Sequence, residues 1–129
     1  ALYPHPGGWR EANTVRRGHE FNNPLIAVVD SAHPGDWPAE KSFVQVAPEN
    51  VVLTVLKKAE DSDDLMLRCY ESGGLACHAD VTFNPAIQTD AVHGTDLLEQ
   101  SQNEIPLTPN GFETDMGSYA IETFKLIRD

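Results

Sequence analysis

The stretch that decides the fold is residues 65–83, which read LMLRCYESGGLACHADVTF. From residue 65 to residue 70 the odd-numbered positions are apolar, and from residue 75 to residue 83 the odd-numbered positions are apolar again. Strict alternation is the period of a half-buried strand. Ser72-Gly73-Gly74 separates the two runs and is a turn signal. The stretch therefore predicts a β-hairpin with one apolar face.

The two cysteines test this hairpin. With Gly73 at the centre of the turn, Cys69 and Cys77 face each other across the two strands. Direct cross-strand neighbours have Cβ atoms roughly 4.5–5.5 Å apart. Both cysteines lie in the apolar phase of their strands, so we expect a buried pair, and in a reducing compartment two free thiols.

Short strand-like segments continue on both sides of this stretch. Val51 to Leu56 is β-branched and apolar on both faces, which predicts a central strand. Asn110-Gly111 marks a tight turn between two further segments. The other candidate strands are residues 43–47, 86–92, the stretch around 97–98, 105–107, 112–114 and 119–127. Without any βαβ alternation, the pattern predicts an all-β fold, an antiparallel β-sandwich of seven to nine short strands preceded by one short N-terminal helix.

The first 39 residues have a different character. They hold five of the nine prolines and both tryptophans. A helix is expected between Gly7-Gly8 and Asn22-Asn23-Pro24, because Trp9, Ala12, Arg16, His19 and Glu20 recur at spacings of three and four. Residues 25–29 then predict a short strand, and residues 31–39 a linker. We divide the chain at this point into residues 1–39 and residues 40–129.

Charge and composition exclude several classes of protein. The 129 residues carry 20 acids against nine bases, a formal net charge of −11. This excess argues against nucleic acid and anionic membranes as partners, because phosphate binding needs a basic patch. No apolar run approaches the ~20 residues that a membrane helix needs. Two cysteines and no Asn-x-Ser/Thr sequon favour a cytoplasmic protein over a secreted one.

The residues that could carry chemistry form no recognisable motif. None of the five histidines lies at the spacing of a zinc site. The acidic run of residues 60–64 lacks the glycine and bidentate glutamate of a calcium loop, and a solvated loop is the simpler interpretation. Cys69 and Cys77 are interpreted as small buried hydrophobes rather than nucleophiles. No catalytic residue, cofactor-binding residue or metal ligand is predicted.

Two longer stretches resemble a known family. Residues 1–25 read ALYPHPGGWREANTVRRGHEFNNPL, and residues 42–71 read SFVQVAPENVVLTVLKKAEDSDDLMLRCYE. Both resemble the C-terminal region of glycoside hydrolase family 38, the α-mannosidases, as do residues 95–99 and 121–126. The resemblance implies that residues 1–39 are the tail of a larger β-supersandwich domain and residues 40–129 a terminal β-sandwich. It also implies that the zinc and the catalytic residues of this family belong to a separate catalytic domain, so none is assigned here.

Two functions remain open at this point. The first is a non-catalytic β-sandwich that supports the catalytic domain of an α-mannosidase-type hydrolase. Its partners would be the catalytic and supersandwich domains, with a homodimer as a further expectation. The second is an independent carbohydrate-binding module, for which Trp9, Trp37 and Tyr70 are the candidate sugar contacts.

Overall fold

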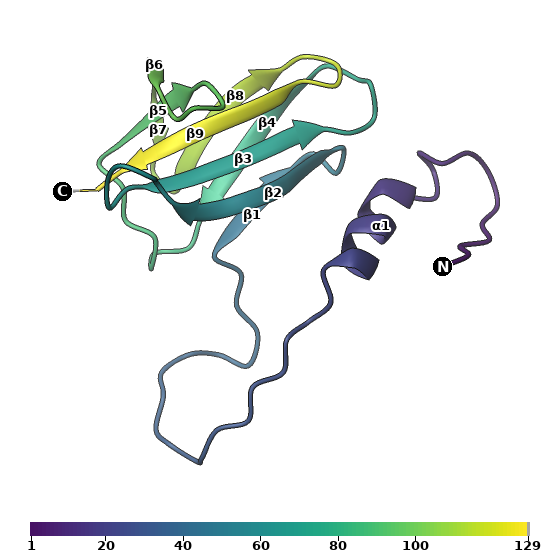
Figure 1. Cartoon of the computed structure of the whole chain (residues 1–129), viewed down its shortest axis with the longest axis horizontal. Helices are drawn as coiled ribbons and strands as arrows, with labels where there is room; N and C mark the ends of the chain where they lie inside the picture. The colour runs from purple at the N-terminus through teal and green to yellow at the C-terminus, as the bar shows by residue number, and fades with distance from the viewer. Residues whose placement is uncertain (129) are drawn as a thin grey trace. The chain divides into compact units, whose positions relative to one another are not determined.

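The computed structural model describes residues 1–128, which form two compact units, Ala1–Lys41 and the residues from Ser42 onward. The first unit contains one helix, α1 (Thr14–Asn22). The second contains nine strands among the described residues: β1 (Val44–Ala47), β2 (Val51–Lys58), β3 (Leu65–Glu71), β4 (Cys77–Phe83), β5 (Ala91–Thr95), β6 (Ser101–Ile105), β7 (Leu107–Thr108), β8 (Gly111–Met116) and β9 (Ile121–Ile127). Figure 1 shows the strands gathered in two layers. No helix in the described part of the chain combines the length and apolar character that crossing a membrane requires.

The strands form two antiparallel sheets. One sheet has the order β1-β4-β8-β7, and the other has the order β2-β3-β9-β5-β6. In Figure 1, β2, β3 and β9 of the five-stranded sheet lie side by side in front of β4 and β8. The fold is therefore the antiparallel β-sandwich that the sequence predicts.

The core lies between the two sheets and is built from the alternating apolar positions. In β4, Ala79 and Val81 are fully buried while His78 and Asp80 are exposed, as the sequence pattern predicts. Phe112 of β8 packs against Phe124 of β9, with ring centroids 4.7 Å apart. The remaining buried core side chains are Val51, Leu67, Cys69, Phe83, Val92, Ile105, Met116 and Leu126. Burial of apolar surface at about 25 cal/mol per Å² is the main force that holds the sheets together.

The predicted hairpin over residues 65–83 is wrong. β3 pairs with β2 and β9, whereas β4 pairs with β1 and β8, so the chain crosses from one sheet to the other between them. Cys69 is fully buried in one sheet, and Cys77, half-buried, lies in the other. The thiol of Cys69 instead lies 3.9 Å from the Sδ atom of Met116, the residue opposite Cys77 in the β4–β8 register. Alternation correctly assigns Leu67 and Cys69 of β3 to the buried face, although Met66, in the opposite phase, is buried as well. It does not say which strand is the neighbour.

Two further strand predictions also fail. Val51–Lys58 is an edge strand, because only β3 pairs with it; the register shifts between Leu53 and Val55, and exposure alternates after that point. Residues 25–29 form no strand, and their apolar side chains are exposed. A strand needs a neighbour for its backbone groups, and the first unit offers none to this segment.

Other boundaries shift by a few residues. The helix begins at Thr14 rather than just after Gly8, because Asn13 adopts a left-handed conformation with φ 51°. Its C-terminal end at Asn22 agrees with the stop predicted at Asn22-Asn23-Pro24. Residues 97–98 lie in the β5–β6 turn, not in a strand. The Asn110-Gly111 signal does mark the reversal between the paired strands β7 and β8, but the turn residues are Pro109 and Asn110, and Gly111 is the first residue of β8.

Candidate functional site

The three aromatic residues named as candidate sugar contacts belong to two different units. Trp9 is 40% exposed and has the Arg10 guanidinium 4.4 Å from its ring centroid. Trp37 is 55% exposed and has the Lys41 ammonium 3.7 Å from its ring centroid. Tyr70 is half-buried in β3, in the other unit. Sugar binding by these three residues stays a prediction.

Three carboxylates of the acidic loop of residues 60–64, those of Glu60, Asp63 and Asp64, lie near lysine ammonium groups of the same unit. Lys57 bridges Glu60 and Glu99, and its ammonium lies 2.8 Å from the Glu99 carboxylate. The ammonium of Lys58 lies 2.5 Å from the carboxylate of Asp63. Ser62 donates a hydrogen bond to Asp64, which lowers the pKa of that carboxyl together with the backbone N–H of Arg128. These contacts agree with a solvated loop fastened to the neighbouring strands.

No metal centre emerges from the side chains. Within residues 1–128, no group of three or more His, Cys, Asp or Glu side chains is arranged to hold a metal ion. The described residues therefore offer no set of ligands that fits the zinc that the resemblance implies for the family.

One carboxylate that the sequence interpretation missed organises an end of the sandwich. Glu71, the last residue of β3, has an exposed fraction of 0%. Its carboxylate accepts five hydrogen bonds. The donors are Asn50 Nδ2 at 2.7 Å and the backbone N–H groups of Gly73 at 2.6 Å, Gly74 at 2.7 Å, Leu75 at 3.1 Å and Tyr119 at 3.0 Å. The carboxylate thus joins the β3–β4 crossover to the loop before β9.

These hydrogen bonds decide the charge state of Glu71. Burial alone raises the pKa of a carboxyl group, but the N–H donors of Tyr119, Gly73 and Gly74 and the Asn50 amide outweigh it and lower the pKa of Glu71 to about 2. The group is therefore ionised at neutral pH. The side chain is buried, and the five hydrogen bonds hold its carboxylate against the backbone of the two loops. An acid directly before Ser-Gly-Gly is the signal in the sequence that could have indicated this loop cap.

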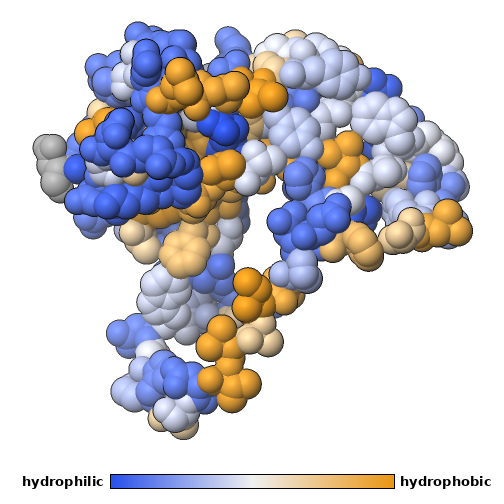
Figure 2. Space-filling view, viewed as in Figure 1, coloured by the Kyte–Doolittle hydropathy of each residue, from blue (hydrophilic) through white to orange (hydrophobic). Residues whose placement is uncertain are grey.

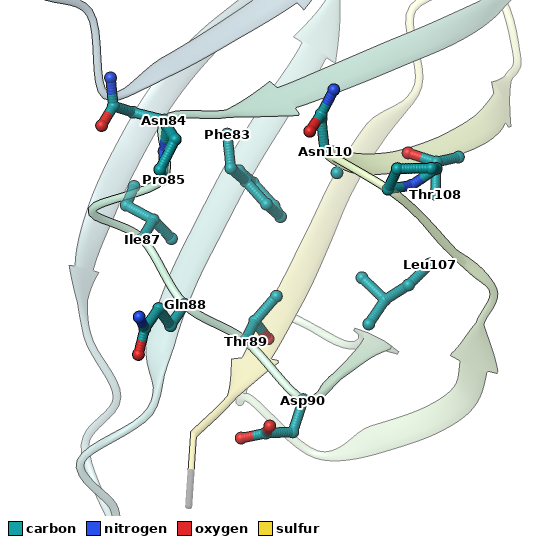
Figure 3. Close-up of a pocket in the computed structure, with 12 residues that line it drawn as sticks. Phe83, Asn84, Pro85, Ile87, Gln88, Thr89, Asp90, Leu107, Thr108 and Asn110 are labelled. Carbon is teal, nitrogen blue, oxygen red and sulfur yellow. The ribbon is translucent and has the colours of Figure 1, made fainter.

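A cavity of about 380 Å³ lies between the β4–β5 loop and the β7–β8 turn. Figure 3 shows Phe83, Ile87 and Leu107 around its centre, while the Gln88 and Asp90 side chains extend away from it. Thr89, Thr108, Asn84 and Asn110 also line the cavity. Among the residues that line it, Asp90 is the only one with a carboxyl group, so the cavity lacks the pair of carboxyl groups that glycoside hydrolysis requires.

Comparison with known proteins gives the relationship of the chain. Residues 50–124 match the model of the glycosyl hydrolases family 38 C-terminal beta sandwich domain. Alpha-mannosidase 2C1 of Mus musculus is 29% identical over 133 aligned positions that cover 98% of this chain, and the Homo sapiens protein of the same name is 33% identical over 78% of it. Alpha-mannosidase G of Dictyostelium discoideum is 31% identical over 65% of the chain.

The alignments cover only 12%, 10% and 8% of these three relatives, so the chain spans about a tenth of their length. The matched family model begins at residue 50, one residue before β2, and ends within β9. It therefore falls within the unit that forms the sandwich. The chain belongs to glycosyl hydrolase family 38, and the match to the C-terminal β-sandwich domain of that family covers strands β2 to β8 and part of β9.

Proposed function

We propose that this chain is a non-catalytic, structural part of an α-mannosidase-type hydrolase that takes part in the breakdown of mannose-containing glycans. The proposal rests on the contacts that two sets of carboxylates make, that of Glu71 and those of the acidic loop. Glu71 is sealed inside a hydrogen-bonded loop cap, and the acidic loop is paired with lysines. A retaining glycosidase needs two carboxyl groups about 5–5.5 Å apart on either side of an open sugar site. Neither set of carboxylates provides this arrangement.

The first unit is the part that we expect to contact the remainder of such a hydrolase. None of the residues of α1 is buried. The segment after the helix exposes Leu25 at 102%, Ile26 at 90%, Val28 at 84% and Val29 at 97%. Figure 2 shows this apolar run along the extended segment between the helix and the sandwich. Contiguous exposed apolar surface marks interaction sites, which supports assigning residues 1–39 to the tail of a preceding β-supersandwich domain.

The proposal includes a cytoplasmic location and assigns the catalytic zinc to another part of the hydrolase. Both cysteines are free in the structure, and persistent free thiols are usual in a reducing compartment. We expect the chain to retain two free thiols when it is purified without reductant from a cytosolic fraction. We do not expect this result for the chain purified from a secreted fraction.

An activity measurement tests the non-catalytic assignment. The purified chain is incubated with an aryl α-mannoside, with and without added zinc, beside a heat-killed control. We expect no hydrolysis above that control in either condition. Turnover by the folded chain would show that it contains its own active site and would refute the proposal.

The supporting role needs a second experiment, in an intact family 38 hydrolase that carries this sequence. Val81→Asp places a charge in the core, because Val81 is fully buried between the sheets. We expect faster thermal inactivation of the hydrolase with an unchanged KM for the aryl mannoside. Thr82→Asp, on the outer side of the same strand, is the matched control and should inactivate at the rate of the unmodified protein. Equal inactivation rates for both variants would contradict a supporting role.

A further inference from the structure

The outer face of the four-stranded sheet carries an unusual charge pattern. Its strands β1, β4, β7 and β8 contain no lysine or arginine, while His78, Asp80, Glu113 and Asp115 lie on its exposed side. His78 is opposite Asp115 in the register of β4 and β8, and Asp80 is opposite Glu113. Among the described residues of these strands, His78 is thus the one side chain that can carry a positive charge.

The imidazole of His78 lies between two carboxylates. Its Nδ1 atom is 2.8 Å from Oδ1 of Asp115, and its Nε2 atom is 3.2 Å from Oε2 of Glu113. An ionised carboxylate only accepts hydrogen bonds, and a neutral imidazole has a single N–H. Both contacts can be hydrogen bonds only when both ring nitrogens carry a proton. The imidazolium ion is therefore the form of His78 that can donate to both carboxylates at once.

We propose that His78, Glu113 and Asp115 form a protonation-dependent clasp between β4 and β8, closed while the imidazole carries its second proton. Loss of that proton leaves one carboxylate opposite a nitrogen lone pair, so one of the two contacts opens. The charge of His78, Asp80, Glu113 and Asp115 together then changes from −2 to −3, because the only positive charge among the four is removed. The clasp thus couples pH to the charge of the whole outer face of this sheet.

The surroundings of the clasp all favour the charged imidazole. Asp80 is two residues away on the same strand, and β8 contributes Glu113 and Asp115. On the other side of β4, β1 faces it with the uncharged residues Gln45 and Ala47, followed in the next turn by Glu49. Apart from His78, the charged residues of β1, β4 and β8 are therefore all negative. The hydrogen bonds to Asp115 and then to Glu113 raise the pKa of His78 above its usual value, against a small opposing effect of burial.

The test is an NMR titration of the His78 ring protons in the full chain between pH 5 and pH 9. We expect a midpoint above the ordinary value of about 6.5 for histidine. Asp115→Asn and Glu113→Gln should each shift the midpoint downward, and the double variant should shift it furthest. The matched control is Glu104→Gln, which makes the same change of charge in β6 of the other sheet and should leave the midpoint where it is. A midpoint at or below 6.5, or one that the double variant does not move, would overturn the proposal.

A stability measurement provides the second readout. A raised pKa in the folded state stabilises the fold below the pKa of the unfolded state, and this contribution is lost as pH rises through the folded pKa. The melting temperature of the unmodified chain should therefore exceed that of His78→Gln at pH 6, and the difference should shrink toward pH 9. A difference that is constant or grows with pH would show that His78 does not act through its proton.

Discussion

Replacing Glu71 by glutamine should destabilise the sandwich strongly, because this carboxylate is the cap of two loops. Oε1 accepts from Asn50 and Gly73, and Oε2 accepts from Gly74, Leu75 and Tyr119. A glutamine has a single acceptor oxygen. Whichever way its amide turns, an NH₂ group meets two or three N–H donors and leaves them unsatisfied.

The magnitude follows from two routes. The shift of the Glu71 pKa from 4.5 to about 2 corresponds to about 3 kcal/mol at 1.36 kcal/mol per pKa unit. Leaving a buried donor unsatisfied costs about 1–3 kcal/mol for each group. The first route gives about 3 kcal/mol, and the second gives about 2–9 kcal/mol for two or three unsatisfied donors. We therefore expect a loss of at least about 3 kcal/mol in the free energy of unfolding at pH 7, a large part of the 5–15 kcal/mol that stabilises most domains.

The pH dependence has a definite sign. The pKa of Glu71 is lower in the folded state than in the unfolded state, so ionisation of this group stabilises the fold above about pH 4.5. That contribution disappears as pH falls from 4.5 toward 2. The difference between the unmodified chain and Glu71→Gln should therefore be constant between pH 5 and pH 7 and shrink by about 3 kcal/mol toward pH 2.

Urea unfolding monitored by far-UV circular dichroism measures this difference. Tryptophan fluorescence is unsuitable because Trp9 and Trp37 both lie in the first unit, outside the sandwich. Glu104→Gln is the control, since it removes an exposed carboxylate from the same unit. If Glu71→Gln unfolded within about 0.5 kcal/mol of this control, or if its deficit did not change between pH 7 and pH 3, the assignment of Glu71 as an ionised loop cap would be refuted.

Three further predictions concern other parts of the chain. In thiol titration, Cys69 should react only on unfolding, because burial raises the pKa of its thiol to about 12. Half-buried Cys77 should react faster in the folded chain, and equal rates for the two thiols in the folded chain would contradict this difference. Gly111→Ala should lower the free energy of unfolding by about 3 kcal/mol or more, since a Cβ atom there would lie 1.8 Å from the Val81 carbonyl oxygen. Gly35→Ala, where a Cβ atom would have nothing within 4 Å, should leave the free energy of unfolding unchanged in the same assay. Hydrogen exchange should be faster in residues 1–30 than in β2 and β3, because α1 has no buried residue; equal protection would mean that the first unit is an integral part of the sandwich.

The sequence by itself determined the class of fold and much of the core. Alternation over residues 77–83 correctly assigns Ala79 and Val81 to the inner face of β4, because a period of two is a property of the strand alone. The turn between β7 and β8 could be predicted to within one residue for the same reason, since its conformation depends on adjacent residues. The resemblance of residues 42–71 to the α-mannosidase family also needed no coordinates.

Only the tertiary structure decided which strands are neighbours and which carboxylate is structural. A hairpin and a crossover between sheets would both show the same alternation of apolar and polar residues in β3 and β4. The sequence pattern therefore could not show that Cys69 and Cys77 lie in opposite sheets. The donors that enclose Glu71 come from positions as distant as Asn50 and Tyr119. Likewise, the two carboxylates that flank His78 are 35 and 37 residues away from it in the chain. Such arrangements depend on long-range backbone pairing, which a local pattern does not contain.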